Sequence, residues 1–173
     1  NSLHTVNIPV SSALSVIEEN AFLNCNSLKN INLQAAKQLT RIADYAFAEC
    51  GGLEELRLPE SLLYIQNYAF YNCASLKKLI FDGSSKLTEI GERAFVGCEN
   101  LLRITIPDSV IRIGSHAFYE NNLQQIIFTE ASRLSVIEDY AFAYSNNVKE
   151  LHLFGNVSLI SQGAFINSPS LRW

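Results

Sequence analysis

The sequence has 173 residues, of which 48% are hydrophobic and 17% are charged, and its formal net charge is −4 at pH 7. This length is enough for one domain that buries its own core, and the composition excludes a disordered or collagen-like chain. The acidic balance excludes sequence-independent binding to nucleic acid, and no run of about 18 apolar residues predicts a membrane span.

One pattern repeats from the start of the chain to its end. Phe follows Ala at seven positions, which are separated by 25, 23, 25, 23, 24 and 23 residues. These positions are Phe22, Phe47, Phe70, Phe95, Phe118, Phe142 and Phe165. A fixed period in the twenties is typical of a solenoid. We therefore predict a single repeat domain over residues 1–173, with about seven repeats after a partial strand at Leu3, Val6 and Ile8.

Each repeat contains three predicted elements, which repeat four illustrates in chain order. Leu87–Ile90 predicts a short extended edge, and Glu92–Cys98, around the Ala-Phe pair, predicts one or two helical or 3-10 turns. Leu101–Ile106 is too short for a helix and ends in period two, which favours a short strand. With no room for a hairpin, these strands must stack in parallel. We expect an α/β repeat fold with one parallel strand and one helical turn per coil of 23–25 residues.

Only one loop of the repeat changes its length. It follows the strand and alternates between a short form, as at Pro59–Ser61 and Pro107–Ser109, and a longer form, as at Asp82–Lys86. Variation at a single corner is typical of a solenoid, because an insertion there bulges outward.

The repeat resembles the BspA-like, or Treponema-pallidum-type, leucine-rich repeat. It is nearly complete at Ile90, Gly91, Ala94, Phe95, Cys98, Leu101, Ile104, Ile106 and Pro107. It departs from the general leucine-rich consensus, because Cys precedes the strand leucines rather than following them. The resemblance implies a right-handed, curved solenoid and a secreted or cell-surface location. It also implies an adhesion or binding role toward a protein or glycan, including a host extracellular-matrix or cell-surface protein.

Four cysteines occupy one column in successive coils: Cys25, Cys50, Cys73 and Cys98. No close pair of cysteines indicates a metal site. The column is interpreted as buried thiols. Disulfides between coils are the alternative, because the Cα atoms of cysteines in stacked coils should lie within the distance range that a disulfide allows. Repeat five lacks one residue at this position, and Ser145 and Ser168 replace Cys in the last two repeats.

No catalytic group is predicted. The three histidines, His4, His116 and His152, lie in different coils and different columns, and no phosphate-binding loop is present. We therefore expect a protein that is not an enzyme and that carries no cofactor or metal.

The strand face is the candidate binding surface. Two residues per strand should point outward, and solenoids commonly bind ligands through the sheet that such residues form. Ile80 and Ile127 should be exposed apolar residues among polar and basic neighbours. An ordinary sheet surface is the alternative interpretation, since β-branched residues favour strands. The candidate ligand-binding residues are Arg57, Lys78, Ile80, Arg103, Thr105, Ile127 and His152.

Three further hypotheses come from the sequence. A column of Tyr45, Tyr68 and Tyr140 either packs across neighbouring coils or forms a binding stripe, and Asn156 begins a glycosylation sequon. The chain contains no Met and shows no polar capping repeat, so we expect a fragment of a longer array whose uncapped coils could associate end to end. A structural spacer that projects other domains is the alternative to a ligand-binding domain.

Overall fold

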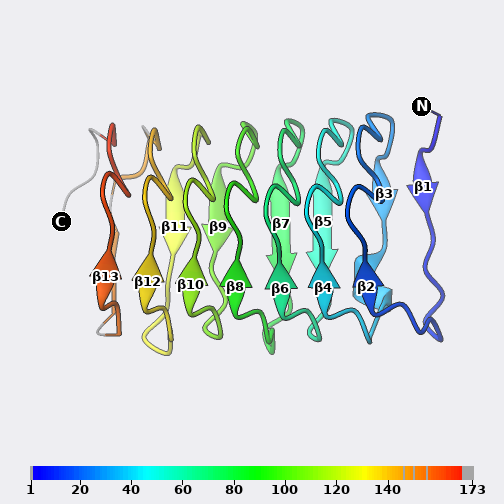
Figure 1. Ribbon diagram of the computed structural model, residues 1–173, viewed down its shortest axis with the longest axis horizontal. Helices are drawn as coiled ribbons and strands as arrows, with labels where there is room; N and C mark the ends of the chain where they lie inside the picture. Colours follow the sequence, from blue (N-terminus) through cyan, green and yellow to red (C-terminus); the bar gives the residue numbers. More distant parts are fainter. Residues whose placement is uncertain (1, 146, 150, 155, 169–173) are drawn as a thin grey trace.

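The chain forms a row of about seven coils, which Figure 1 shows side by side along the long axis. The computed structural model describes residues 2–145, 147–149, 151–154 and 156–168. Each coil contributes to two layers of parallel strands, and these two layers enclose one core. The predicted parallel solenoid is confirmed, whereas its right-handed winding stays a prediction.

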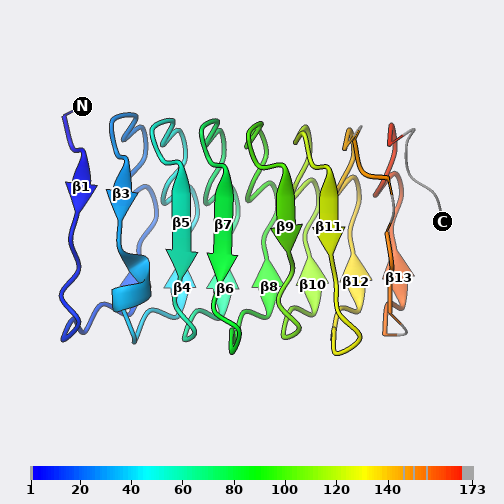
Figure 2. The ribbon, with the colours of Figure 1, turned by 180° about the vertical axis from the view of Figure 1, so that it is seen from behind.

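The strands of the first layer come from the Leu-x-x-Ile-x-Ile segments and lie in front in Figure 2. They are β1 (Thr5–Val6), β3 (Asn30–Ile31), β5 (Glu55–Leu58), β7 (Lys78–Phe81), β9 (Arg103–Thr105) and β11 (Gln125–Ile127). Apolar and outward residues alternate along them, as in the buried Leu56 and Leu58 beside the exposed Glu55 and Arg57. We call the outward surface of these six strands the long-strand face.

The second layer is one continuous seven-stranded sheet made from the extended edges that precede each Ala-Phe pair. Its strands are β2 (Val16–Ile17), β4 (Arg41–Ile42), β6 (Tyr64–Ile65), β8 (Glu89–Ile90), β10 (Arg112–Ile113), β12 (Val136–Ile137) and β13 (Leu159–Ile160). The isoleucine of each strand from β2 to β12 is buried against the core. The predicted second extended edge is therefore a full sheet.

The phenylalanine column forms the centre of the core. Phe47, Phe70, Phe95, Phe118 and Phe142 are fully buried. Neighbouring rings along the column lie 4.9–5.4 Å apart between centroids and are tilted by no more than 7°. This distance is typical of offset stacking, so each ring contacts the coils on both sides and the column joins the coils into one core.

The helical or 3-10 turn that we predicted around each Ala-Phe pair is not found. In the third coil, the N–H groups of Tyr68, Phe70 and Asn72 donate to carbonyls of the next coil, each at 2.8 Å. The N–H groups of Tyr71 and Cys73, which follow Phe70 and Asn72, close turns within their own coil. A helix needs consecutive bonds within one segment, so bonding every second N–H to the next coil prevents it. The only helix among the described residues is the 3-10 turn η1 (Leu33–Ala35), at the variable loop.

The segment around each Ala-Phe pair, which we call the arc, also contains two positions with a left-handed backbone in every repeat. They lie two residues before and two residues after each Phe, as at Tyr68 with φ 56° and Asn72 with φ 54°. Bulky residues rarely adopt this conformation, and here the bonds to the next coil hold it in place.

The long-strand face is divided into pairs of strands, unlike the continuous second sheet. Ladders join β1 to β3, β5 to β7 and β9 to β11, but none joins β3 to β5 or β7 to β9. The N–H groups of Lys77 and Lys78 donate to Glu54 O at 2.8 and 3.2 Å, inside the β5–β7 pair. No such bond crosses from β9 to β7 in the described part of the chain. We call this boundary the β7/β9 seam.

The seams follow the alternation of loop length. The longer loop of the third coil bonds back to the coil before it, where Lys86 N–H donates to Glu60 O at 3.1 Å. The loop of the fifth coil does the same through Arg133 N–H and Asp108 O at 2.9 Å. The pairs β5–β7 and β9–β11 therefore each join a short-loop coil to the longer-loop coil after it. The pair β1–β3 departs from this rule, because a longer loop follows both of its strands.

Candidate functional site

The outward columns of the long-strand face lie in the register that the repeat predicts. Each outward residue is opposite its counterpart in the paired strand: Glu55 with Lys78, Arg57 with Ile80, Arg103 with Gln125, and Thr105 with Ile127. Of the seven candidate residues, five are exposed: Arg57, Lys78, Arg103, Thr105 and His152. Ile80 and Ile127, which we predicted to be exposed, are half-buried, because their neighbours cover part of each side chain.

The basic side chains at β5 and β7 are partly neutralised. Glu55 contacts Arg57 Nε at 3.2 Å and Lys78 Nζ at 3.7 Å. Such exposed pairs stabilise the fold little, but they offset one of the two positive charges. The predicted mixture of apolar and basic character is therefore kept here with a weaker positive charge.

A groove of about 470 Å³ opens along the β7/β9 seam. Ile80 and Thr105 line it, so the structure brings together two of the predicted residues. The other lining residues are Leu79, Phe81, Asp82, Gly83, Ser85, Ile106, Pro107, Asp108 and Thr129. Most of the groove therefore belongs to strand ends and corner loops, which the strand-face prediction omitted.

Two further hollows lie on the same face, also at boundaries between strand pairs. One, of about 330 Å³, lies where β3 meets β5 and includes Arg57. The other, of about 610 Å³, lies between β11 and residues 147–149 and includes Arg103 beside Lys149. Arg57 and Arg103 thus line two other hollows, although Arg57 is opposite Ile80 in the strand register and Arg103 shares strand β9 with Thr105.

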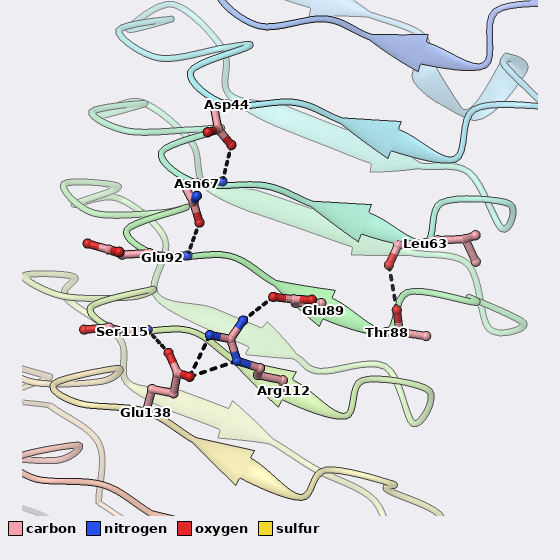
Figure 3. Close-up of polar contacts among 9 residues, drawn as sticks. All are labelled: Asp44, Leu63, Asn67, Thr88, Glu89, Glu92, Arg112, Ser115 and Glu138. Atoms are coloured by element: carbon pink, nitrogen blue, oxygen red, sulfur yellow. Dashed lines mark hydrogen bonds and ion pairs between the residues drawn. The ribbon is translucent and has the colours of Figure 1, made fainter.

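A second cluster of charged side chains lies on the opposite sheet and joins neighbouring coils (Figure 3). Arg112 on β10 bonds to Glu89 on one side and to Glu138 on the other, with Nε of Arg112 at 2.8 Å from Oε1 of Glu138. The second oxygen of Glu138 accepts the Ser115 N–H at 3.0 Å. Asn67 Oδ1 accepts a backbone N–H from the next coil at 2.9 Å in the same way. These groups are engaged in holding the coils together, which favours a structural role.

The cysteine column is a ladder of thiols bonded to backbone carbonyls. Cys50, Cys73 and Cys98 each donate Sγ–H to the carbonyl of a Phe in the preceding coil, at 3.2–3.3 Å. No disulfide joins the four cysteines, and the described residues contain no cluster of His, Cys, Asp or Glu that could hold a metal. The structure favours the buried-thiol interpretation over disulfides.

Repeat five keeps this ladder with a different residue. Asn121 is only 1% exposed, and its Nδ2 donates to Phe95 O at 3.0 Å. The sequence reads as a deletion at this position, but Asn121 supplies the missing donor.

Burial should make the thiols of this ladder unreactive. Burial raises the pKa of Cys50 and of Cys98 to about 12, and it raises the pKa of Cys73 well above its usual value. Because the thiolate is the reactive form, we expect the folded protein to leave these three cysteines unlabelled by Ellman's reagent near pH 8. All four thiols should react after unfolding in guanidinium. Rapid labelling of Cys73 in the folded protein would contradict the buried ladder.

The tyrosine column packs along the arc. Tyr45 and Tyr68 stack with ring centroids 4.6 Å apart, and His116 stacks on Tyr140 at 5.0 Å. Because these ring faces cover one another, the packing interpretation is favoured over a binding stripe. Burial lowers the pKa of His116, and the nearby charge of Arg93 lowers it further.

No histidine lies in a catalytic arrangement among the described residues. The Ser115 hydroxyl lies 2.8 Å from Nδ1 of the adjacent His116, but it also contacts Asp139 O at 3.1 Å. No carboxylate hydrogen-bonds the His116 ring among the described contacts, as the base of a catalytic triad would require. His4 bonds to Ser2 O, and His152 lies on the other layer from His116.

The whole sequence matches one known family. The family described as BspA type leucine rich repeat region matches residues 1–85 and 75–172 in six copies. No curated protein matches the chain. No helix among the residues placed by the structure is long and apolar enough to cross a membrane.

Solved leucine-rich repeat structures share this fold. The chain is similar to the Treponema pallidum leucine rich repeat protein, with 26% identity and a TM-score of 0.83, covering 99% of this chain and 79% of that one. It is similar to the pneumococcal vaccine antigen PcpA, with 26% identity, a TM-score of 0.67, and coverage of 98% and 49%. A leucine-rich repeat protein from Eubacterium ventriosum is similar in fold alone, with 16% identity, a TM-score of 0.65, and coverage of 96% and 59%. The chain thus spans only about half of the pneumococcal antigen.

Proposed function

Because the chain belongs to the BspA-type leucine-rich repeat family, we propose that it is a non-enzymatic recognition domain that binds a protein ligand through its long-strand face. The groove at the β7/β9 seam, which Ile80 and Thr105 line, is the observation that carries this proposal. A concave site with apolar walls and a few polar groups is the usual form of a binding pocket. The absence of a catalytic arrangement among the described side chains supports a role in binding rather than in chemistry.

A location outside the cell or on its surface is part of the proposal. The support is the likeness to the pneumococcal vaccine antigen, at 26% identity. A host extracellular-matrix or cell-surface protein would then be a suitable class of partner.

A structural spacer is the second candidate. Stacked phenylalanines run from Phe22 to Phe165, and the second sheet is continuous over seven strands. Such nearest-neighbour packing stiffens a solenoid along its axis, and this would serve a domain that only projects others. The experiment below separates the two functions.

The long-strand face can be tested by adding charge to it. We expect the triple variant Ile80→Lys, Thr105→Lys and Ile127→Lys to lose at least tenfold in affinity for those purified extracellular-matrix proteins that bind the unmodified domain. The reason is that ammonium groups at these three outward positions would have to lose their hydration at the interface. The measurement is surface plasmon resonance on a panel of matrix proteins, with circular dichroism to check the fold.

The control is a matched variant on the opposite sheet. Tyr64 and Leu159 lie in that sheet, and Ile111 directly precedes its strand β10. These three residues are 43%, 50% and 39% exposed, and they can be replaced by Lys in the same way. We expect this variant to bind as the unmodified domain does. Equal binding by both triple variants would reject the long-strand face and favour the spacer.

A further inference from the structure

We infer that the groove at the β7/β9 seam receives an arginine side chain of the protein partner. This inference rests on the proposed function, because it names the chemistry that the long-strand face recognises. Three observations carry it: an opening that the missing strand pairing creates, apolar walls along its length, and two carboxylates at one end that lack a cation.

The opening is confined to one side of the solenoid. No ladder joins β7 to β9, whereas β8 pairs with both β6 and β10 on the second sheet. Just before strands β8 and β10, Ser109 Oγ donates to Leu87 O at 2.7 Å and joins the same two coils. The coils are therefore held together behind the groove while they stay apart at its mouth. A ligand can enter without breaking a backbone hydrogen bond between β7 and β9.

The walls of the groove suit a methylene chain. Ile80, Phe81 and Pro107 are half-buried and still expose part of their apolar surface, while Ile106 closes the groove from the core. Long basic side chains cover apolar surface with their stems and keep the charged head in a polar environment. The wall surface therefore matches the three methylenes of arginine.

The end of the groove suits a cation. Asp82 and Asp108 line it from adjacent coils, and both are exposed. Thr129 Oγ1 donates to Asp108 Oδ1 at 2.6 Å and so orients that carboxylate. Neither Asp has an ion pair among the described side chains, whereas glutamates elsewhere in the chain do. The paired ones are Glu18, Glu54, Glu55, Glu60, Glu89, Glu92 and Glu138.

Arginine fits the apolar walls and the acidic end of the groove better than other side chains do. Its guanidinium is always charged, is planar, and presents several donors that can contact more than one carboxylate. Arginine is also enriched in protein interfaces, where it frequently dominates binding. The formal net charge of −4 on this chain adds a favourable long-range attraction for a basic partner.

The test uses a small probe, so that it does not depend on knowing the partner. N-acetyl-L-argininamide is titrated into the ¹⁵N-labelled full chain, and the amide shifts are followed by NMR. We expect saturable shifts at residues 80–85, at residues 105–108 and at Thr129. N-acetyl-L-citrullinamide, which has the same shape without the charge, should bind at least fivefold more weakly.

Two variants locate the charge. Asp82→Asn together with Asp108→Asn should weaken arginine binding at least fivefold, and raising the salt concentration should weaken binding to the unmodified chain. Asp139→Asn, an exposed change on the arc, should leave the affinity unchanged. Equal binding of the arginine and citrulline probes, equal binding by the double variant, or shifts outside the groove would each overturn the inference.

The same double variant separates this inference from the proposed function. If it binds matrix proteins as well as the unmodified domain does, while the triple variant of the long-strand face does not, the arginine site is wrong and the binding face stands. If the arginine probe binds at the groove but the triple variant keeps full matrix binding, the groove stands and the proposed function fails.

Discussion

Replacing Phe95 with Ala is expected to lower the free energy of unfolding by about 3–5 kcal/mol, the usual cost of deleting a buried aromatic ring. Phe95 is fully buried, and its ring stacks on Phe70 and on Phe118 with both centroid distances at 5.1 Å. The substitution therefore removes contacts to two coils and leaves a cavity at the middle of the column. Urea denaturation followed by circular dichroism measures the loss.

Phe22→Ala is the matched control for this substitution. Phe22 is half-buried and stacks on one described ring, that of Phe47 at 4.9 Å. We expect it to cost less than half as much, because less apolar surface leaves water when its ring packs. In a solenoid each coil is stabilised by its neighbours, so Phe95→Ala should also broaden the transition. Equal losses for the two variants would show that the column does not couple the coils.

The core could be predicted from the sequence because every interior position repeats with one period. The Ala-Phe spacing placed Phe70 and Phe95 in one column, and period two within a strand separated the buried Leu79 from the outward Lys78 and Ile80. Both patterns depend only on the hydrophobicity of each residue, which the sequence gives directly.

The arc could not be predicted because its structure depends on bonds between coils. The local sequence of such a turn is the same whether its alternate N–H groups donate to carbonyls of their own segment, as in a helix, or to carbonyls of the next coil. Tyr68, Arg93 and His116 adopt a positive φ of 52–56°, which their residue types do not indicate. The hydrogen bonds of the next coil over-determine this conformation, and no single repeat contains that information.

The candidate site was predicted only in part, for a similar reason. The outward columns follow from period two, which placed Ile80 and Thr105 on one face. The groove between them depends on backbone bonds that are missing between strands 25 residues apart in the chain. The alternation of loop length was visible in the sequence, but the division of the strands into pairs was not. Asp82 and Asp108, in those loops, were therefore omitted from the predicted site.

Replacing Asn121 with Ala is expected to lower the free energy of unfolding by about 1–3 kcal/mol. Asn121 Nδ2 is the donor to Phe95 O in the buried ladder, at 3.0 Å. Alanine would remove this donor and leave the carbonyl with only the longer bond from Cys98 N–H at 3.4 Å, which costs about 1 kcal/mol, and it would add a small cavity. Part of this cost is offset, because the buried Asn121 Oδ1 has no hydrogen-bond partner and is removed with the side chain. The adjacent Asn122 is a matched control, since its Nδ2 also donates to a carbonyl of the preceding coil, Glu99 O at 3.0 Å, but in an exposed position. Asn122→Ala should change stability by less than about 1 kcal/mol, and chemical denaturation of both variants measures the difference. If Asn121→Ala is as mild as Asn122→Ala, then Asn121 does not replace the thiol of the other repeats.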